Sequence, residues 1–192
     1  MLNTLSETLG KYAHGWLVLL CLAGMLLFNG LILPNQQATI ERMSGGVGTI
    51  DPQLFYTPEK AYSMVSAYGG AGRIAYRNFE LTGDILYPVL YTAFFALLIT
   101  WLYQRGFTPG SPMQKSNVVP LGGWLFDLFE NLGIAAMLSV YPSTPAWLAR
   151  AAAVFTLLKW LFAGAAILLI LIGLVMVLKN KFRKQQRKLT GT

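Results

Sequence analysis

Four long apolar stretches alternate with polar connections along the chain. They cover residues 16–33, 81–103, 118–140 and 146–178. About 20 apolar residues in a helix span the hydrocarbon core of a bilayer, so each stretch predicts one transmembrane helix. The last stretch is longer than one crossing needs, and we expect it to tilt or to protrude. The pattern predicts an all-α membrane four-helix bundle, in which residues 1–178 form a single transmembrane domain.

Proline and aromatic residues mark the ends of these stretches. Pro34 follows the first, and Tyr141-Pro142 follows the third. Aromatic side chains favour the membrane interface, and Trp16, Trp101 and Trp147 lie at such ends. The first stretch is long and has no clear small-x-small cleavage site after it. We therefore predict a retained helix here and not a signal peptide.

The connection over residues 34–80 predicts amphipathic helices. Thr57-Pro58-Glu59 has the form of an N-cap, a first-turn proline and an early acid. Apolar residues then recur at helical spacing until Gly69-Gly70, and a second amphipathic stretch runs from Arg73 to Leu81. Such helices favour the membrane surface. The glycine-rich segment over 44–48 lacks the GK[ST] ending of a phosphate loop and predicts a turn.

Composition supports the membrane assignment. Hydrophobic residues make up 55% of the 192 residues and charged residues only 12%, with a mean hydropathy of +0.50. Soluble domains carry about 25% charged residues. The net charge of +7 is concentrated in the tail over 179–192, which holds six of the fifteen Lys and Arg residues. A basic cluster beside an apolar helix is typical of a cytoplasmic anchor facing anionic lipid, and we expect no nucleic-acid partner.

The basic residues also predict an orientation. One side of the predicted topology holds Lys11, Arg105, Lys115 and the six tail residues, whereas five lie on the other side, mostly in the long connection. The richer side is the cytoplasmic one, so we predict that both termini are cytoplasmic and that residues 34–80 are external. The predicted location is the cell membrane, with several crossings.

Seven residues within the predicted spans are the candidate ligand-binding or proton site. They are Asp84, Tyr87 and Tyr91 in the second span, Asp127, Glu130 and Asn131 in the third, and Lys159 in the fourth. A charge at mid-bilayer costs about 2.5–3.5 kcal/mol on insertion scales, so such residues normally face the bundle interior. At 1.5 Å per residue, Glu130 and Lys159 lie at similar depths, and one acid is expected to pair with Lys159. The alternative is a purely structural role, in which the polar groups hold the helices in register.

Cysteine and histidine restrict the chemistry. Cys21 is the single cysteine, so no disulfide within the chain and no Cys-based zinc site is available, and no Ser-His or Cys-His hydrolase set appears. We predict no metal site. A hard-cation site from Asp84, Asp127 and Glu130 is the alternative, and no cofactor is indicated.

The candidate residues also carry a resemblance. The run Gly72-Arg73, Tyr76, Asp84, Tyr87-Pro88 and Tyr91, followed by Asp127 and Glu130-Asn131, resembles a group of small bacterial four-span membrane proteins of uncharacterised function. This resemblance implies the topology and no activity. Pro145-Ala146-Trp147 before the last span is similar to the four-spanning EXPERA group, which includes sterol isomerases and sterol-binding receptors. None of that group's acidic residues is carried over to this chain.

Three functions agree with these features. The first is binding or transport of a small amphiphile, lipid or ion by the acid and lysine cluster. The second is an intramembrane enzyme that uses a carboxylate pair for acid–base chemistry on a lipid-like substrate. The third is a non-catalytic subunit of a homo-oligomer or a larger membrane complex. A cavity around the converging polar groups would favour the first two.

Overall fold

Helices form all the regular secondary structure of the part of the chain that the computed structural model describes, residues 2–190. In chain order they are α1 (Leu2–Tyr12), α2 (Gly15–Leu27), the π-helical turn η1 (Phe28–Ile32), α3 (Leu33–Ser44), α4 (Pro58–Ala67), α5 (Gly69–Glu80), α6 (Gly83–Gly106), the 3₁₀ segment η2 (Pro112–Val118), α7 (Pro120–Val140) and α8 (Ala146–Thr190). The all-α prediction is confirmed.

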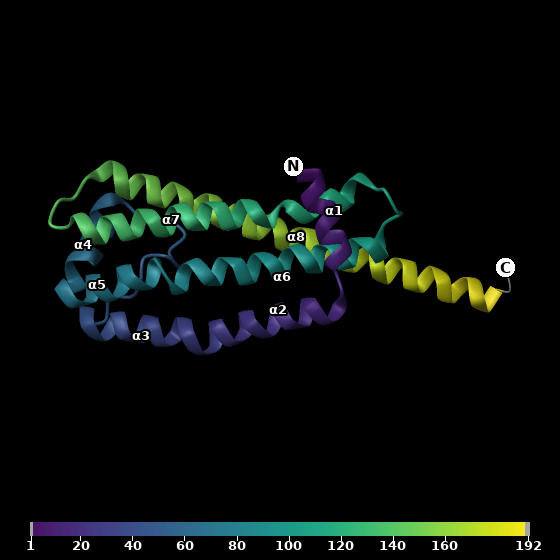
Figure 1. Ribbon diagram of the computed structural model, residues 1–192, viewed down its shortest axis with the longest axis horizontal. Coiled ribbons are helices and arrows are strands. Elements are labelled where there is room, and N and C mark those ends of the chain that lie inside the picture. Colours follow the sequence, from purple (N-terminus) through teal and green to yellow (C-terminus); the bar gives the residue numbers. More distant parts are fainter. Residues whose placement is uncertain (1, 191–192) are drawn as a thin grey trace.

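Four of these helical segments are long and apolar enough to cross a membrane, as expected of an integral membrane protein. They cover Gly15–Ser44, Gly69–Gly106, Pro112–Val140 and Ala146–Gln186. Figure 1 shows them side by side as a bundle, with both chain ends at the same end of it. The predicted four-helix membrane bundle is therefore the observed architecture. The terminal end of the bundle is the end where the N-terminus lies and from which α8 extends. The loop end is the opposite end, where α4 and α5 lie.

The first apolar helix does not end at Pro34, where the sequence pattern places the end of the apolar stretch. It continues through η1 into α3 and ends at Ser44. Proline lacks the N–H that a helix interior needs, but it is tolerated in the first turn of a helix. Pro34 lies in the first turn of α3, directly after the π-helical turn. The change of hydrogen-bond pattern at η1 thus accommodates Pro34 within one continuous helical segment.

The amphipathic helices α4 and α5 close the loop end of the bundle. Thr57 caps α4 as predicted, because its Oγ1 accepts a hydrogen bond from the Lys60 N–H. Most apolar residues of α4 pack against protein, whereas Ile74 of α5 is 55% exposed, and the predicted position of these helices on the membrane surface stays a prediction. Val65 and Tyr68 are buried in one hydrophobic cluster with Met137 of α7 and Ala149 of α8. Burial of these side chains against α7 and α8 fixes α4 and the start of α5 on the bundle.

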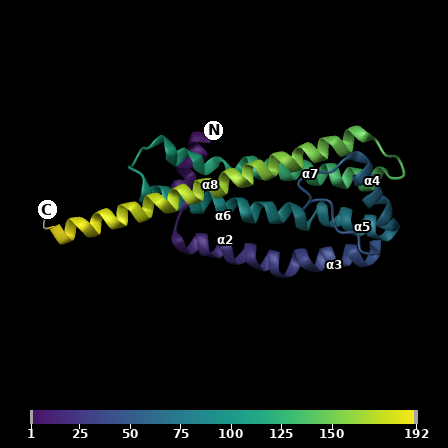
Figure 2. The same cartoon turned by 180° about the vertical axis from the view of Figure 1, so that it is seen from behind.

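The segment between α3 and α4 re-enters the bundle. Gly45 and Gly46 have φ values of 70° and 100°, a left-handed conformation that glycine adopts readily, and they turn the chain back after α3. The segment then runs beside the helices, as both ribbon views show (Figures 1 and 2), and its residues Ile50 and Tyr56 are 0% and 3% exposed. The Tyr56 hydroxyl lies 3.5 Å from Thr156 Oγ1, about 15 Å along α8 from its start at 1.5 Å per residue. Thr49, Ile50 and Tyr56 pack into protein, as non-helical backbone within a membrane bundle requires, whereas Leu54 and Phe55 are 61% and 75% exposed.

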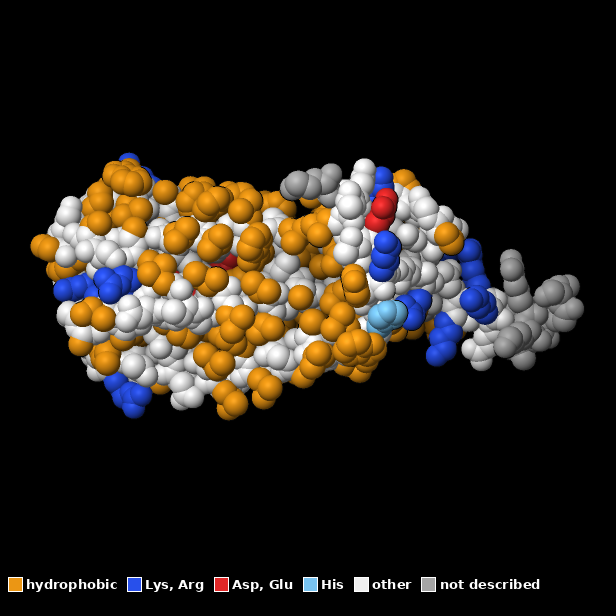
Figure 3. Space-filling view, in the orientation of Figure 1, with side chains coloured by type: hydrophobic (Ala, Val, Ile, Leu, Met, Phe, Trp, Pro, Cys, Tyr) orange, Lys and Arg blue, Asp and Glu red, His pale blue; other side chains and the backbone are white. Residues whose placement is uncertain are grey.

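The terminal end carries most of the positive charge. Helix α1 lies across it and accepts a hydrogen bond at the Gly10 carbonyl from Gln104 Nε2 of α6, at 2.7 Å. Helix α8 extends past the bundle, as its length predicts (Figure 1). In the face shown by Figure 3, apolar side chains cover the middle of the bundle and Lys and Arg gather at the two ends. This distribution matches a membrane core between two interfaces.

Candidate functional site

An ion-paired group joins α7 to α8 inside the bundle. The spacing of Asp127 and Glu130 places both on one face of α7, towards α8. Lys159 Nζ forms an ion pair with Glu130 Oε2 and lies 3.9 Å from Asp127 Oδ1. Thr156 Oγ1 donates a 2.6 Å hydrogen bond to Glu130 Oε1. Each oxygen of the fully buried Glu130 carboxylate therefore has a polar partner, and the lysine serves both acids.

Two tyrosines of α6 stand beside this group, and only one of them touches it. The Tyr91 hydroxyl donates a 2.7 Å hydrogen bond to Asp127 Oδ2. The Tyr87 hydroxyl instead exchanges hydrogen bonds with the Asn29 side chain of η1, at 2.8 and 3.2 Å. The two rings meet edge to face with centroids 5.4 Å apart. Tyr91 is thus part of the polar centre, whereas Tyr87 ties α6 to the first helix.

Asn131 connects the ion-paired group to the start of α6. Its Nδ2 donates a 2.6 Å hydrogen bond to the backbone carbonyl of Asp84. Its Oδ1 is buried and has no hydrogen-bond partner among the described residues. The carboxylate of Asp84 does not pair with Lys159, and it belongs to a second acidic group.

The second group, here called the acidic triad, consists of Asp51, Glu80 and Asp84. One oxygen of each lies within 4.8 Å of one oxygen of each of the others. Glu80 ends α5 and Asp84 begins α6 after a break of two residues, so a tight connection brings them together. Asp51 comes from the re-entrant segment, 29 residues before Glu80 in the sequence.

Tyr76 fixes Asp51 in the triad. It lies one helical turn before Glu80 on the same face of α5. Its hydroxyl donates to Asp51 Oδ1 and accepts a 2.8 Å hydrogen bond from the Ile50 N–H. Thr49 Oγ1 donates to the other Asp51 oxygen at 3.3 Å. Asp51 is therefore oriented by its neighbours, and the re-entrant segment is held against α5.

Glu80 is the exceptional member of the triad. It is 0% exposed, and neither carboxylate oxygen has a hydrogen-bond partner among the described residues. Native proteins rarely bury a carboxyl group without a compensating partner, because an unpaired buried charge costs several kcal/mol. The local structure thus leaves Glu80 in need of a proton or a bound cation.

A relay of hydroxyl groups links the re-entrant segment to the ion-paired group. Because the proton of Thr156 Oγ1 is donated to Glu130, the Tyr56 hydroxyl acts as the donor towards Thr156. Burial raises the pKa of the Tyr56 phenol well above its ordinary value, so this donor keeps its proton. The chain Tyr56–Thr156–Glu130–Lys159 therefore joins the segment to α7 and α8.

Counting charges over the two groups gives a large excess of acid. Five of the eight Asp and Glu residues of the chain lie here, and Lys159 is the one basic side chain that the described structure pairs with them. Like charges this close in a low-dielectric interior repel strongly. The polar centre is therefore suited to positively charged species and unsuited to anions.

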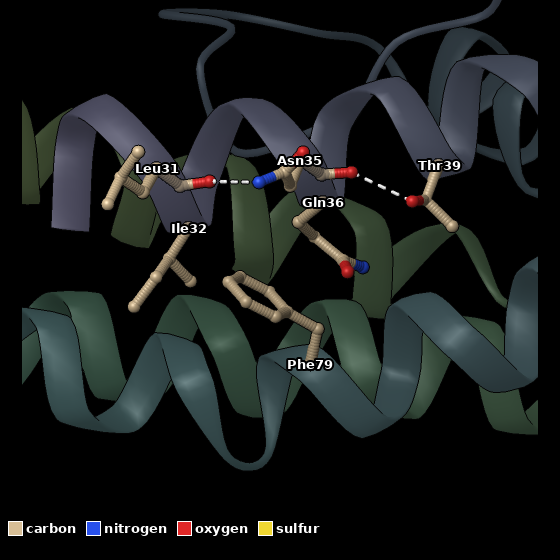
Figure 4. A pocket seen from close by; sticks show the side chains of 6 residues that line it. All are labelled: Leu31, Ile32, Asn35, Gln36, Thr39 and Phe79. Atoms are coloured by element: carbon tan, nitrogen blue, oxygen red, sulfur yellow. Dashed lines mark hydrogen bonds between the residues drawn. The ribbon is translucent and has the colours of Figure 1, made fainter.

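Two hollows lie between the first helix and α5, and one of them reaches the acidic triad at Asp51. A cavity of about 120 Å³ is lined by Asp51, Thr49, Gln36, Gln37 and Tyr76, with Leu33, Pro52 and Phe79 completing its wall. A wider open groove of about 430 Å³ lies between the first helix and α5, and it shares Gln36 and Phe79 with the cavity. In Figure 4 the Phe79 ring extends from α5 towards Ile32 and Gln36 of the first helix, which also carries the other groove residues Leu31, Asn35 and Thr39.

The structure brings most of the seven predicted site residues together, with three differences. Asp127, Glu130, Lys159 and Tyr91 meet as one group. Tyr87 turns to Asn29, Asn131 bonds the Asp84 backbone, and the Asp84 carboxylate joins the triad.

Sequence reasoning missed Asp51 and Glu80. Both lie in the connection that the pattern places outside the membrane, where acids are ordinary. The helical spacing of Tyr76, Glu80 and Asp84 was the available signal, since it continues one polar face from α5 into α6.

Comparison of the chain with protein-family models, with curated proteins and with solved structures gives no match.

Proposed function

We propose that this protein is a membrane-embedded binding protein for a small cation, protons included, which it holds among the carboxylates at the loop end of its bundle. The observation that carries the proposal is the gathering of five acids, four of them buried, around a single lysine that pairs with only two of them. Structural pairing alone accounts for Glu130 and Asp127, which share Lys159. It leaves the acidic triad without a counter-charge, and this is the part that a bound cation satisfies.

The size of the cavity favours a small ligand. Sites for drug-sized molecules have volumes of about 300–1,000 Å³. The cavity at Asp51 has about 120 Å³, which is room for about four water molecules at ~30 Å³ each. A hydrated or partly hydrated ion fits this space, and a lipid headgroup with its chains does not.

The position of the site favours access from the loop end. Between the ion-paired group and the terminal end, the bundle is filled by apolar side chains such as Leu97, Ile99, Leu102 and Ala166. The cavity instead opens beside the re-entrant segment. With both termini in the cytoplasm, as the basic residues favour, the cation enters from the external side of the cell membrane. This arrangement supports binding and gives no open path across the bundle.

Thermal unfolding of the purified full-length protein in detergent tests the proposal. If the unpaired carboxyl groups hold protons in the folded state, the folded protein binds more protons than the unfolded chain above about pH 4, where free carboxyl groups ionise. The free energy of unfolding then falls as the pH rises. The free energy of unfolding should fall in this way in a buffer whose only cation is bulky and organic. Adding a small cation that binds the site should raise the free energy of unfolding again.

A matched pair of double variants assigns the effect to the site. Glu80→Gln with Asp84→Asn removes two triad charges and should flatten the pH dependence of the melting temperature. Glu7→Gln with Glu59→Gln removes two exposed acids and should leave the wild-type profile. A wild-type protein with the same melting temperature at every pH and in every cation would contradict the proposal, and so would a triad variant that keeps the wild-type profile.

A second candidate, an amphiphile ligand, is favoured by the open groove of Figure 4. Its apolar residues Leu31, Ile32 and Phe79 suit a hydrocarbon chain, and it adjoins the cavity through Gln36. Mass spectrometry of the protein purified from a lipid extract tests it. Retention of one lipid class by the wild type, and its loss in Phe79→Ala, would support this candidate. A lipid profile that matches the bulk membrane in both proteins would remove it.

A further inference from the structure

The acidic triad has the geometry of a metal-binding site, a property that the sequence alone did not predict. Two ligand oxygens on opposite sides of one Ca²⁺ ion lie about 4.6–5.2 Å apart, and neighbouring ligands lie closer, because each bond is about 2.3–2.6 Å long. The three carboxylates offer one oxygen each within 4.8 Å of one another. One ion at their centre can therefore contact all three at once.

A second, independent observation points to a ligand at the same place. Glu80 is fully buried, its two oxygens have no hydrogen-bond partner in the described structure, and one of them is directed into the triad. Hydrogen bonds from Tyr76 and Thr49 satisfy Asp51 from outside the triad, as outer groups commonly orient metal ligands. The oriented Asp51 and the unsatisfied Glu80 form a set of oxygens that is suited to binding a cation.

We propose that Asp51, Glu80 and Asp84 bind one hard divalent cation, Ca²⁺ in preference to Mg²⁺. This inference rests on the proposed function and names the cation. Carboxylate oxygens suit hard cations, and zinc, which prefers nitrogen and sulfur ligands, is disfavoured because neither Cys21 nor His14 belongs to the triad.

Charge decides between divalent and monovalent ions. Three ionised carboxylates carry three negative charges, so a divalent cation leaves one in excess and a monovalent cation leaves two. Two unpaired negative charges in a buried site cost more free energy than one, so the divalent cation is favoured. Ca²⁺ also accepts irregular sets of six to eight oxygens, whereas Mg²⁺ requires a near-ideal octahedron at about 2.0–2.1 Å. Three protein oxygens up to 4.8 Å apart match the longer bonds and irregular coordination of Ca²⁺.

The cavity supplies the rest of the coordination shell and the entry path. It includes Asp51, Thr49 and Tyr76 in its wall and has room for about four water molecules at ~30 Å³ each. Three carboxylates and three or more waters complete the six or more ligands that Ca²⁺ takes. The amide side chains of Gln36 and Gln37 at the cavity wall offer oxygens along the way in.

The test uses the full-length protein in detergent after treatment with a chelator. Its melting temperature is measured with CaCl₂, MgCl₂ or NaCl at equal ionic strength and at a pH where free carboxyl groups are ionised. A ligand that binds only the folded state raises the melting temperature in proportion to the logarithm of its concentration. We expect a rise of several degrees with millimolar Ca²⁺, a smaller one with Mg²⁺ and none with Na⁺.

Three variants locate the ion. Glu80→Gln should abolish the response to Ca²⁺, yet melt at or above the ion-free wild type, because it removes an unpaired buried charge. Glu59→Gln, at an exposed acid, should respond as the wild type does. Asp127→Asn should also keep the response, because Asp127 pairs with Lys159. Luminescence of Tb³⁺, a probe for Ca²⁺ sites, should rise on binding, fall again when Ca²⁺ is added, and be absent in Glu80→Gln.

The outcomes separate this inference from the proposed function. One outcome would overturn the divalent site and leave cation binding standing. In it, the melting temperature of the wild type does not respond to Ca²⁺ or Mg²⁺, but it depends on pH or Na⁺, and Glu80→Gln loses that dependence. A melting temperature that changes with no cation and with no change of pH would overturn both the divalent site and the proposed function. A Ca²⁺ response that persists in Glu80→Gln would place the ion elsewhere and overturn the triad site.

Discussion

Lys159 of α8 forms its ion pair with Glu130 of α7 deep within the bundle, about 15 Å from the end of α7 at 1.5 Å per residue. The same ammonium group lies 3.9 Å from Asp127. One cation thus neutralises part of two carboxylates on adjacent turns, and it binds α7 to α8. The pair explains how these two helices keep their register. The other three acids of the polar centre form no ion pair among the described residues.

Removing this lysine should destabilise the protein. Lys159→Met leaves Glu130 buried and unpaired, and breaking a buried pair costs about 3–5 kcal/mol. Adding Glu130→Gln should restore part of that loss, because the stranded charge disappears. Lys179→Met is the matched control, since it makes the same change at an exposed position of the same helix. Denaturant unfolding in detergent measures these proteins together with the single variant Glu130→Gln, and strictly additive losses in the double variant would refute the pairing.

The hydrogen bond between Tyr91 and Asp127 is expected to contribute measurably to stability. Tyr91→Phe removes a donor to a largely buried carboxylate, at a cost of about 2 kcal/mol. In an Asp127→Asn background the same change should cost less, because the hydrogen bond is then between neutral groups. Tyr12→Phe, at an exposed tyrosine, should change little. Equal losses for Tyr91→Phe in both backgrounds would show that the hydroxyl does not act through Asp127.

Close contact between α6 and α8 depends on Gly173. A Cβ placed there would lie 2.9 Å from Leu102 Cβ and 2.9 Å from the Tyr103 ring. Gly173→Ala should therefore push the helices apart and cost about 1–3 kcal/mol, the usual range for overpacking. Gly164→Ala is the control on the same helix, because no atom lies within 4 Å of its added Cβ. We expect Gly164→Ala to be neutral or stabilising in the same unfolding assay, and a Gly173→Ala protein of equal stability would disprove the close contact.

Labelling with a membrane-impermeant maleimide tests the topology. In a Cys21→Ala background, Ser63→Cys probes α4 and Lys184→Cys probes the end of α8, both at exposed positions. On intact cells, position 63 should be labelled, and position 184 should react only after permeabilisation. The basis is the excess of Lys and Arg at the terminal end. The reverse pattern would invert the orientation and would place the acidic triad on the cytoplasmic side.

The sequence by itself determined the elements that local physics controls. A bilayer requires about 20 apolar residues in a helix for each crossing, so the hydropathy pattern alone predicted the four spans. The N-cap at Thr57 was also readable, because it depends on a hydrogen bond to a residue three positions away. Charges inside apolar stretches predicted the group of Asp127, Glu130 and Lys159, since a charge in lipid must turn inward and find a partner.

Only the tertiary structure decided where the connection over residues 45–57 lies and what it brings with it. Polar, glycine-rich sequence has no periodicity that distinguishes a solvated loop from a re-entrant one. The position of Asp51 is set by contacts with Tyr76 and by the burial of Ile50 and Tyr56, all of them between residues distant in sequence. Hydrophobic burial and hydrogen bonding across the bundle thus assembled the acidic triad from acids that, read along the chain, belonged to a loop, a surface helix and a helix start.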